Sequence, residues 1–118
     1  MQLGQVKEAI QHFTTAVRTR PKNVAGWEAL VRCLYLSEFY PEAQQQIQSA
    51  LDCTNQKTVF VYYLSAVLFA MGKTKEALVQ LENAMTRSLK HLRKFIDLNP
   101  AILQNPQVVD LIARYKKK

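Results

Sequence analysis

The chain has 118 residues, of which 48% are hydrophobic and 21% charged, and its formal net charge is +7. This length is typical of one domain with a modest core, and the composition is that of an ordinary globular chain. No run of eighteen apolar residues occurs, so the sequence contains no candidate membrane span. We expect Cys33 and Cys53 to be unpaired thiols on two different helices, which predicts a reducing, cytoplasmic location.

Few turn residues interrupt the chain, since it has only three Gly and four Pro. In chain order, the spacing of apolar residues predicts helices near 5–20, 24–37, 41–53, 58–71 and 74–87, then shorter helices near 88–98 and 106–116. Asn99 and Pro100 are expected to end the helix near 88–98. Asn105 and Pro106 are expected to begin the last one, as its cap and its first residue.

The sequence repeats itself at a spacing of thirty-four residues, without gaps. Three columns are identical in every copy: Glu8/Glu42/Glu76, Ala9/Ala43/Ala77 and Ala16/Ala50/Ala84. Two more are apolar in every copy: Phe13/Ile47/Leu81 and Val17/Leu51/Met85. A recurring alanine indicates that two helix backbones approach within about 8–10 Å, where a larger side chain would separate them.

This pattern resembles the tetratricopeptide repeat. The middle copy supplies Trp27, Leu30, Ala43 and Ile47 of the family pattern, and it departs with Asn55 in place of the closing Pro. The resemblance covers residues 1 to about 90 and implies an all-α fold, a right-handed superhelical stack of antiparallel helix hairpins. We expect tetratricopeptide-like repeats over 1–88, built from a half repeat at 1–23 and full repeats at 24–57 and 58–91. Capping helices with a basic tail are then expected at 88–118.

The resemblance also implies a non-enzymatic scaffold that binds a peptide or helix of a partner protein in its concave groove. In this family the first helix of each hairpin lines that groove. The expected lining residues are Glu28, Arg32, Tyr35, Leu36, Val59, Tyr62, Ala66 and Phe69. The three aromatic residues among them suit a role as binding anchors. The alternative is that they pack against each other or beneath the C-terminal helix.

A second hypothesis is an electrostatic binder of nucleic acid or of an anionic membrane surface. Residues 87–118 carry eight basic side chains and only two acidic ones. The expected patch comprises Arg87, Lys90 and Lys94 on one helix face, with Lys116, Lys117 and Lys118 at the end of the chain. The patch lacks interleaved aromatic residues, so we favour a solvated charged face over a nucleic-acid or membrane site.

A third hypothesis is self-association through the N-terminal half repeat. This half repeat has no first helix of its own, so its apolar residues can cover only the helix near 24–37. We expect the flank that faces the missing helix to be partly apolar. Three explanations stay open: an upstream segment absent from this chain, a homodimer through Val6, Ile10 and Val17, or a tolerated exposed patch.

Nothing in the sequence predicts catalysis, a cofactor or a metal site. His12 and His91 lie far apart, and the two Cys and two His residues lack zinc-ligand spacing. Three glycines, Gly4, Gly26 and Gly72, cannot form a phosphate-binding loop.

Overall fold

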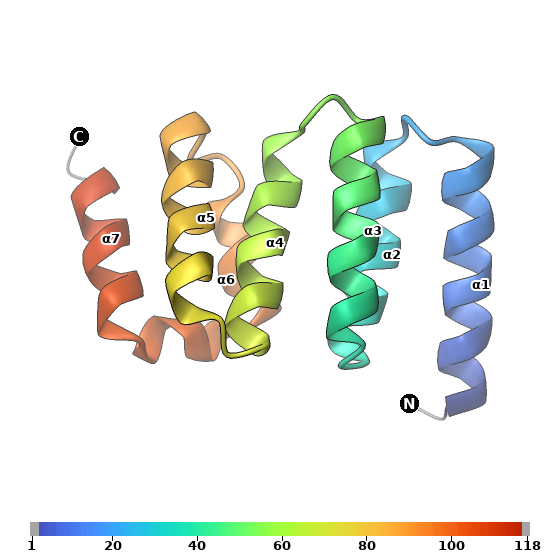
Figure 1. The fold of residues 1–118 in the computed structure, drawn as a ribbon, viewed down its shortest axis with the longest axis horizontal. Helices are drawn as coiled ribbons and strands as arrows, with labels where there is room; N and C mark the ends of the chain where they lie inside the picture. Colours follow the sequence, from blue (N-terminus) through green and yellow to red (C-terminus); the bar gives the residue numbers. More distant parts are fainter. Residues whose placement is uncertain (1–2, 117–118) are drawn as a thin grey trace.

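The computed structural model describes residues 3–116, which fold into a stack of antiparallel helices (Figure 1). The elements are α1 (Leu3–Thr19), α2 (Val24–Leu36), α3 (Tyr40–Cys53), α4 (Thr58–Ala70), α5 (Thr74–Arg87), α6 (Leu92–Leu98), the 3-10 helix η1 (Pro100–Gln104) and α7 (Pro106–Lys116). Each of the helices α1 to α4 contacts the next one along the chain. The expected all-α stack of helix hairpins is confirmed. No helix within residues 3–116 combines the length and the apolar character that crossing a bilayer requires.

Two asparagine side chains cap helices: Asn105, as the sequence predicts, and Asn23, which was not predicted. The Asn23 carboxamide oxygen accepts from the N–H of Ala25 at the start of α2, at 3.1 Å. The Asn105 oxygen accepts from the N–H of Gln107 at the start of α7, at 2.9 Å. Each cap satisfies one of the N–H groups that a first helical turn leaves unpaired, so it sets the residue at which the helix begins.

The turns that end α2 and α4 are equivalent, although they use different residues. Glu38 and Gly72 stand thirty-four residues apart, and both have a positive φ, 64° and 78°. In each turn the following N–H donates to a carbonyl five residues back, from Phe39 to Leu34 and from Lys73 to Leu68. Glycine adopts this conformation without steric cost, whereas a Cβ is disfavoured there, so Glu38 makes the first turn less favourable.

The repeated alanines lie where the helices of one hairpin meet. Ala43 and Ala77 are both 0% exposed. In the second hairpin Ser65 of α4 donates to the carbonyl of Ala77 in α5, at 2.7 Å, which places this column directly against the first helix. Trp27 anchors the other full repeat, because its ring is buried and its indole N–H donates to the carbonyl of Pro21.

The C-terminal helices divide between two places. The helix expected near 88–98 begins only at Leu92, because Ser88 is extended, at φ −170° and ψ 135°, and residues 89–91 form a turn. This corrects the expected boundary. α7 packs on α5 at the end of the stack opposite α1, whereas α6 folds back and contacts α4 (Figure 1). α6 therefore lies within the stack, while α7 covers its end.

Candidate partner-binding groove

α6 covers the aromatic half of the groove that the sequence predicts. Phe95 of α6 is 1% exposed, and its ring centroid lies 6.2 Å from that of Tyr62 and 6.3 Å from that of Phe69. The Tyr62 hydroxyl donates to the carbonyl of Ser88. Burial raises the pKa of Tyr62 to about 12. Of the two possibilities that the sequence leaves open for these aromatic residues, Tyr62 and Phe69 follow the second, because both pack beneath a C-terminal helix.

The other expected lining residues of this half are also buried. Val59 is 2% and Ala66 4% exposed. Tyr35 is 7% exposed, and its ring packs edge-on against that of Tyr40, with the ring centroids 5.5 Å apart. Burial raises the pKa of Tyr35, and a hydrogen bond with Asn99 opposes that shift. With Tyr62, four of the eight residues expected to line the groove are thus buried within the chain, and Phe69 is partly covered.

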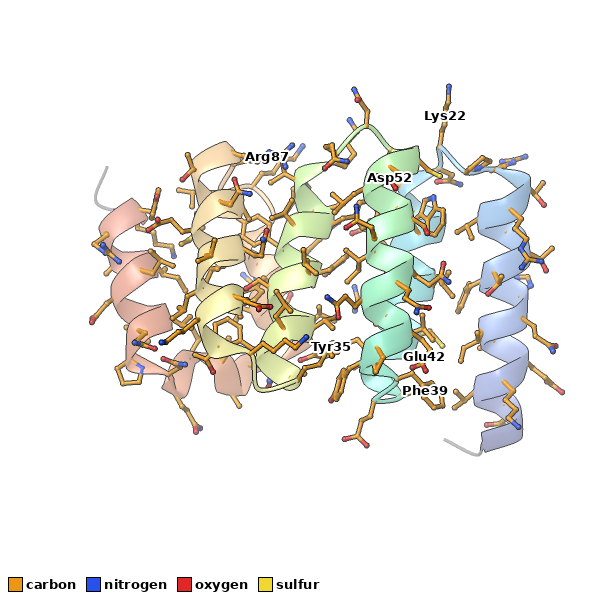
Figure 2. The ribbon with its side chains drawn as sticks, viewed as in Figure 1. Lys22, Tyr35, Phe39, Glu42, Asp52 and Arg87 are labelled. Carbon is orange, nitrogen blue, oxygen red and sulfur yellow. The ribbon has the colours of Figure 1, made fainter. Side chains whose placement is uncertain are left out.

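The remaining part of the concave surface is open, and we call it the α1–α2 groove. It has a volume of about 910 Å³. Its floor is Ala25, Glu28, Ala29, Arg32, Cys33 and Leu36 of α2. Its walls are Val6, Ala9 and Phe13 of α1, the turn residues Ser37, Glu38 and Phe39, and Lys94 of α6. Figure 2 shows Phe39 at this turn, where α2 passes into α3.

Three of the predicted groove residues lie here: Glu28, Arg32 and Leu36. Leu36 is 65% exposed, which is a large apolar surface beside two charged side chains. One Glu28 carboxylate oxygen accepts from the Tyr63 hydroxyl at 2.8 Å and from the Lys94 ammonium at 2.9 Å. This oxygen links α2 to both α4 and α6. Burial raises the pKa of Tyr63, and the hydrogen bond to the Glu28 carboxylate adds to that shift.

The Cys33 thiol lies in the floor of the groove. Cys33 and Cys53 are both free and half-buried. Burial raises the pKa of the Cys33 thiol, and a hydrogen bond with Ser37 partly offsets the shift. The protonated thiol therefore contributes mainly apolar surface to the groove at neutral pH.

A model of the tetratricopeptide repeat matches residues 1–60, which is just over half of the chain. The chain belongs to the tetratricopeptide repeat family. No curated protein and no solved structure matched the chain. Membership of the tetratricopeptide repeat family suggests a protein–protein interaction module.

The predicted basic patch does not form one face of this tetratricopeptide domain. Arg87 ends α5 (Figure 2), and its guanidinium donates to the carbonyl of Gln56 at 2.6 Å. Lys90 lies in the following turn, and Lys94 belongs to α6, where it pairs with Glu28. The prediction that Arg87, Lys90 and Lys94 share a helix face is wrong, because the chain turns between them. Lys116 ends α7, whereas Lys117 and Lys118 lie outside the described residues.

The residues predicted for self-association are mostly covered by the chain itself. Val6 is 6% and Val17 3% exposed. Ile10 is half-buried and lines a smaller groove of about 340 Å³ with residues of α2 and α3. The side of α1 that faces away from α2 is polar, with Glu8 and Gln11 exposed. The partly apolar surface that the sequence predicts beside the half repeat is therefore the α1–α2 groove. Homodimerisation stays a prediction.

Several groove residues were missed from the sequence. Ala9 and Phe13 belong to repeat columns that face a first helix in the other copies, so the periodicity alone points to them. Lys94 carries no such signal, because only the fold-back of α6 brings it beside Glu28.

Proposed function

We propose that this chain is a non-enzymatic adaptor that binds a segment of a partner protein in the α1–α2 groove. The observation that carries the proposal is the open concave surface, in which an exposed Leu36 stands beside Arg32 and Glu28. Family membership supports the class of function, and the groove supports the place.

The composition of the groove favours a mixed apolar and acidic segment. Leu36, Phe13 and the alanines of α1 and α2 offer apolar contact. Arg32 is exposed, and its guanidinium, which also hydrogen-bonds with Tyr63, carries further N–H donors that suit a carboxylate. The Glu28 carboxylate is already engaged by Lys94 and Tyr63, so the floor presents Arg32 as its accessible cation.

Selection from a displayed peptide library against the immobilised chain would test the proposal, and it requires no identified partner. Selected peptides are then titrated against Leu36→Arg and against a matched control, Val79→Arg. Leu36 and Val79 are both 65% exposed, but Val79 lies on α5, outside the α1–α2 groove. We expect at least tenfold weaker binding for Leu36→Arg and less than a twofold change for Val79→Arg. Equal effects of the two substitutions would refute the groove as the binding site.

A further inference from the structure

Each full repeat is a hairpin of a first and a second helix. α1 corresponds to the second helix of such a hairpin, and its first helix is not among residues 3–116. Its Ala9 and Phe13 occupy the repeat columns of Ala43 and Ile47 in α3, and both of those are 0% exposed. The corresponding column in α5 lies directly against α4, because the Ala77 carbonyl accepts from Ser65. In α1 the same two columns are only half-buried and line the α1–α2 groove. The wall of the groove is thus a surface that a first helix covers in both full repeats.

The floor of the groove consists of positions in α2 whose counterparts in α4, thirty-four residues later, are covered. Ala29 stands thirty-four residues before Tyr63, which is 0% exposed and donates to Glu28 of the preceding first helix. Cys33 stands the same distance before Val67, which is also 0% exposed. In the next repeat these columns face α2 and are covered, whereas in α2 they are the open floor. Wall and floor together outline the place of one helix.

We propose that the α1–α2 groove binds one amphipathic α-helix of a partner protein, lying antiparallel to α1 and completing the half repeat. This inference rests on the proposed function and specifies the partner's chemistry. α2 is the template, because it fills the same place against α3. It has 13 residues and buries an apolar stripe at helical spacing, formed by Trp27, Leu30, Val31 and Leu34. The partner helix carries the same stripe, with an acidic residue on the flank that faces Arg32.

A partner helix fits the groove better than the surface of a second folded copy. The exposed large apolar residues within residues 3–116 lie in separate places: Leu36 in α2, Val79 in α5, Leu89 between α5 and α6, Leu103 in η1 and Val109 in α7. A folded copy therefore offers no helix with an exposed apolar stripe among its described residues. Its first helices, α2 and α4, already use their stripes inside the stack.

The test uses a fluorescein-labelled peptide with the sequence of residues 21–38 and the substitution Cys33→Ser. This peptide contains the whole of α2, and its stripe fits the alanine column that α1 shares with α3. Fluorescence polarisation measures its binding to the full chain. The control peptide carries Leu30→Pro in addition, which breaks the helix. We expect the control peptide to bind at least tenfold more weakly.

Two pairs of protein variants locate the peptide. Ala9→Arg and Ala25→Arg each place a charged side chain in the groove, and we expect at least tenfold weaker binding from either. Gln11→Arg and Lys75→Met change exposed residues outside the groove, and we expect less than a twofold change. Circular dichroism checks that every variant folds. Ala25 is exposed, so it provides the test even if Ala9→Arg disturbs the contact of α1 with α2.

The chain also carries an internal probe of occupancy. Cys33 lies in the groove, whereas Cys53 lies outside it on α3. A bound helix should slow the reaction of Cys33 with a thiol reagent at least fivefold and leave the rate at Cys53 unchanged. Unchanged labelling of Cys33 at saturating peptide would overturn the proposal.

The remaining outcomes separate the two proposals. Equal binding of the helical and the proline-containing peptides would overturn the helix and leave the groove function standing. If light scattering shows a dimer that excludes the peptide, the occupant is a second copy, and a partner helix is refuted. If library peptides bind but respond equally to Leu36→Arg and Val79→Arg, the groove function itself fails.

Discussion

Replacing Phe95 with alanine tests whether α6 is part of the core or only rests against it. The Phe95 side chain is 1% exposed and lies between the rings of Tyr62 and Phe69. Truncating a fully buried phenylalanine removes its transfer free energy and leaves a cavity. Such substitutions destabilise proteins by about 3–5 kcal/mol. A domain of this size has an unfolding free energy of about 5–15 kcal/mol, so the loss is a large fraction of the total.

Urea denaturation measures this loss with two independent probes. Far-UV circular dichroism follows all the helices, and the single tryptophan, Trp27, reports on α2. With a urea m-value of about 2 kcal/mol per M, the midpoint should fall by about 1.5–2.5 M. Both probes should shift together, because α6 contacts α4 in the middle of the stack. Leu103→Ala is the control, since Leu103 is 44% exposed, and it should change stability by no more than about 0.5 kcal/mol.

A loss below about 1 kcal/mol for Phe95→Ala would refute the reasoning, because it would mean that the cavity is not formed. A helical signal that falls before the Trp27 fluorescence changes would show that α6 leaves the stack separately. In that case the aromatic half of the concave surface would be open in the variant.

Three further changes test other parts of the structure. The pKa of Tyr62 is raised above its usual 10.0 to about 12 in the folded state. The contribution of this shift to stability is therefore fully present below pH 10 and is lost as the pH rises towards 12. Urea unfolding across this range should show a flatter decline in stability for Tyr62→Phe than for the unchanged chain. Ala43→Leu should lower stability by about 1–3 kcal/mol in thermal unfolding, because Ala43 is 0% exposed. Ala9→Leu, at the equivalent half-buried position of α1, should cost no more than about 0.5 kcal/mol. Equal losses for the two variants would contradict an open groove. Glu38→Gly should raise the urea midpoint by an amount worth about 0.5–1 kcal/mol, since Gly72 already occupies the equivalent positive-φ turn, and a decrease would argue against strain at Glu38.

Most of the fold could be predicted because its signals are local and repeated. Trp27, the alanine columns and the Asn105 cap each act on a helix or on its neighbour in the hairpin. Of the residues expected to line the groove, Glu28, Arg32 and Leu36 line the open α1–α2 groove, and their role in binding stays a prediction. Tyr62 and Phe69 were placed on the correct helix, but the sequence left open whether they anchor a partner or pack beneath a C-terminal helix, because the helix that covers them lies outside the repeat pattern.

The sequence by itself determined the helices and their pairing into hairpins, because a thirty-four-residue period aligns neighbouring apolar faces whatever follows. Only the tertiary structure decided where the concave surface is open. The contacts that bring α6 back join residues far apart in the chain: Tyr62 bonds to a carbonyl 26 residues away, and Lys94 pairs with Glu28 across 66 residues. No periodicity records such pairs, because they depend on the packing of Phe95 into a space that exists only after α4 has joined the stack.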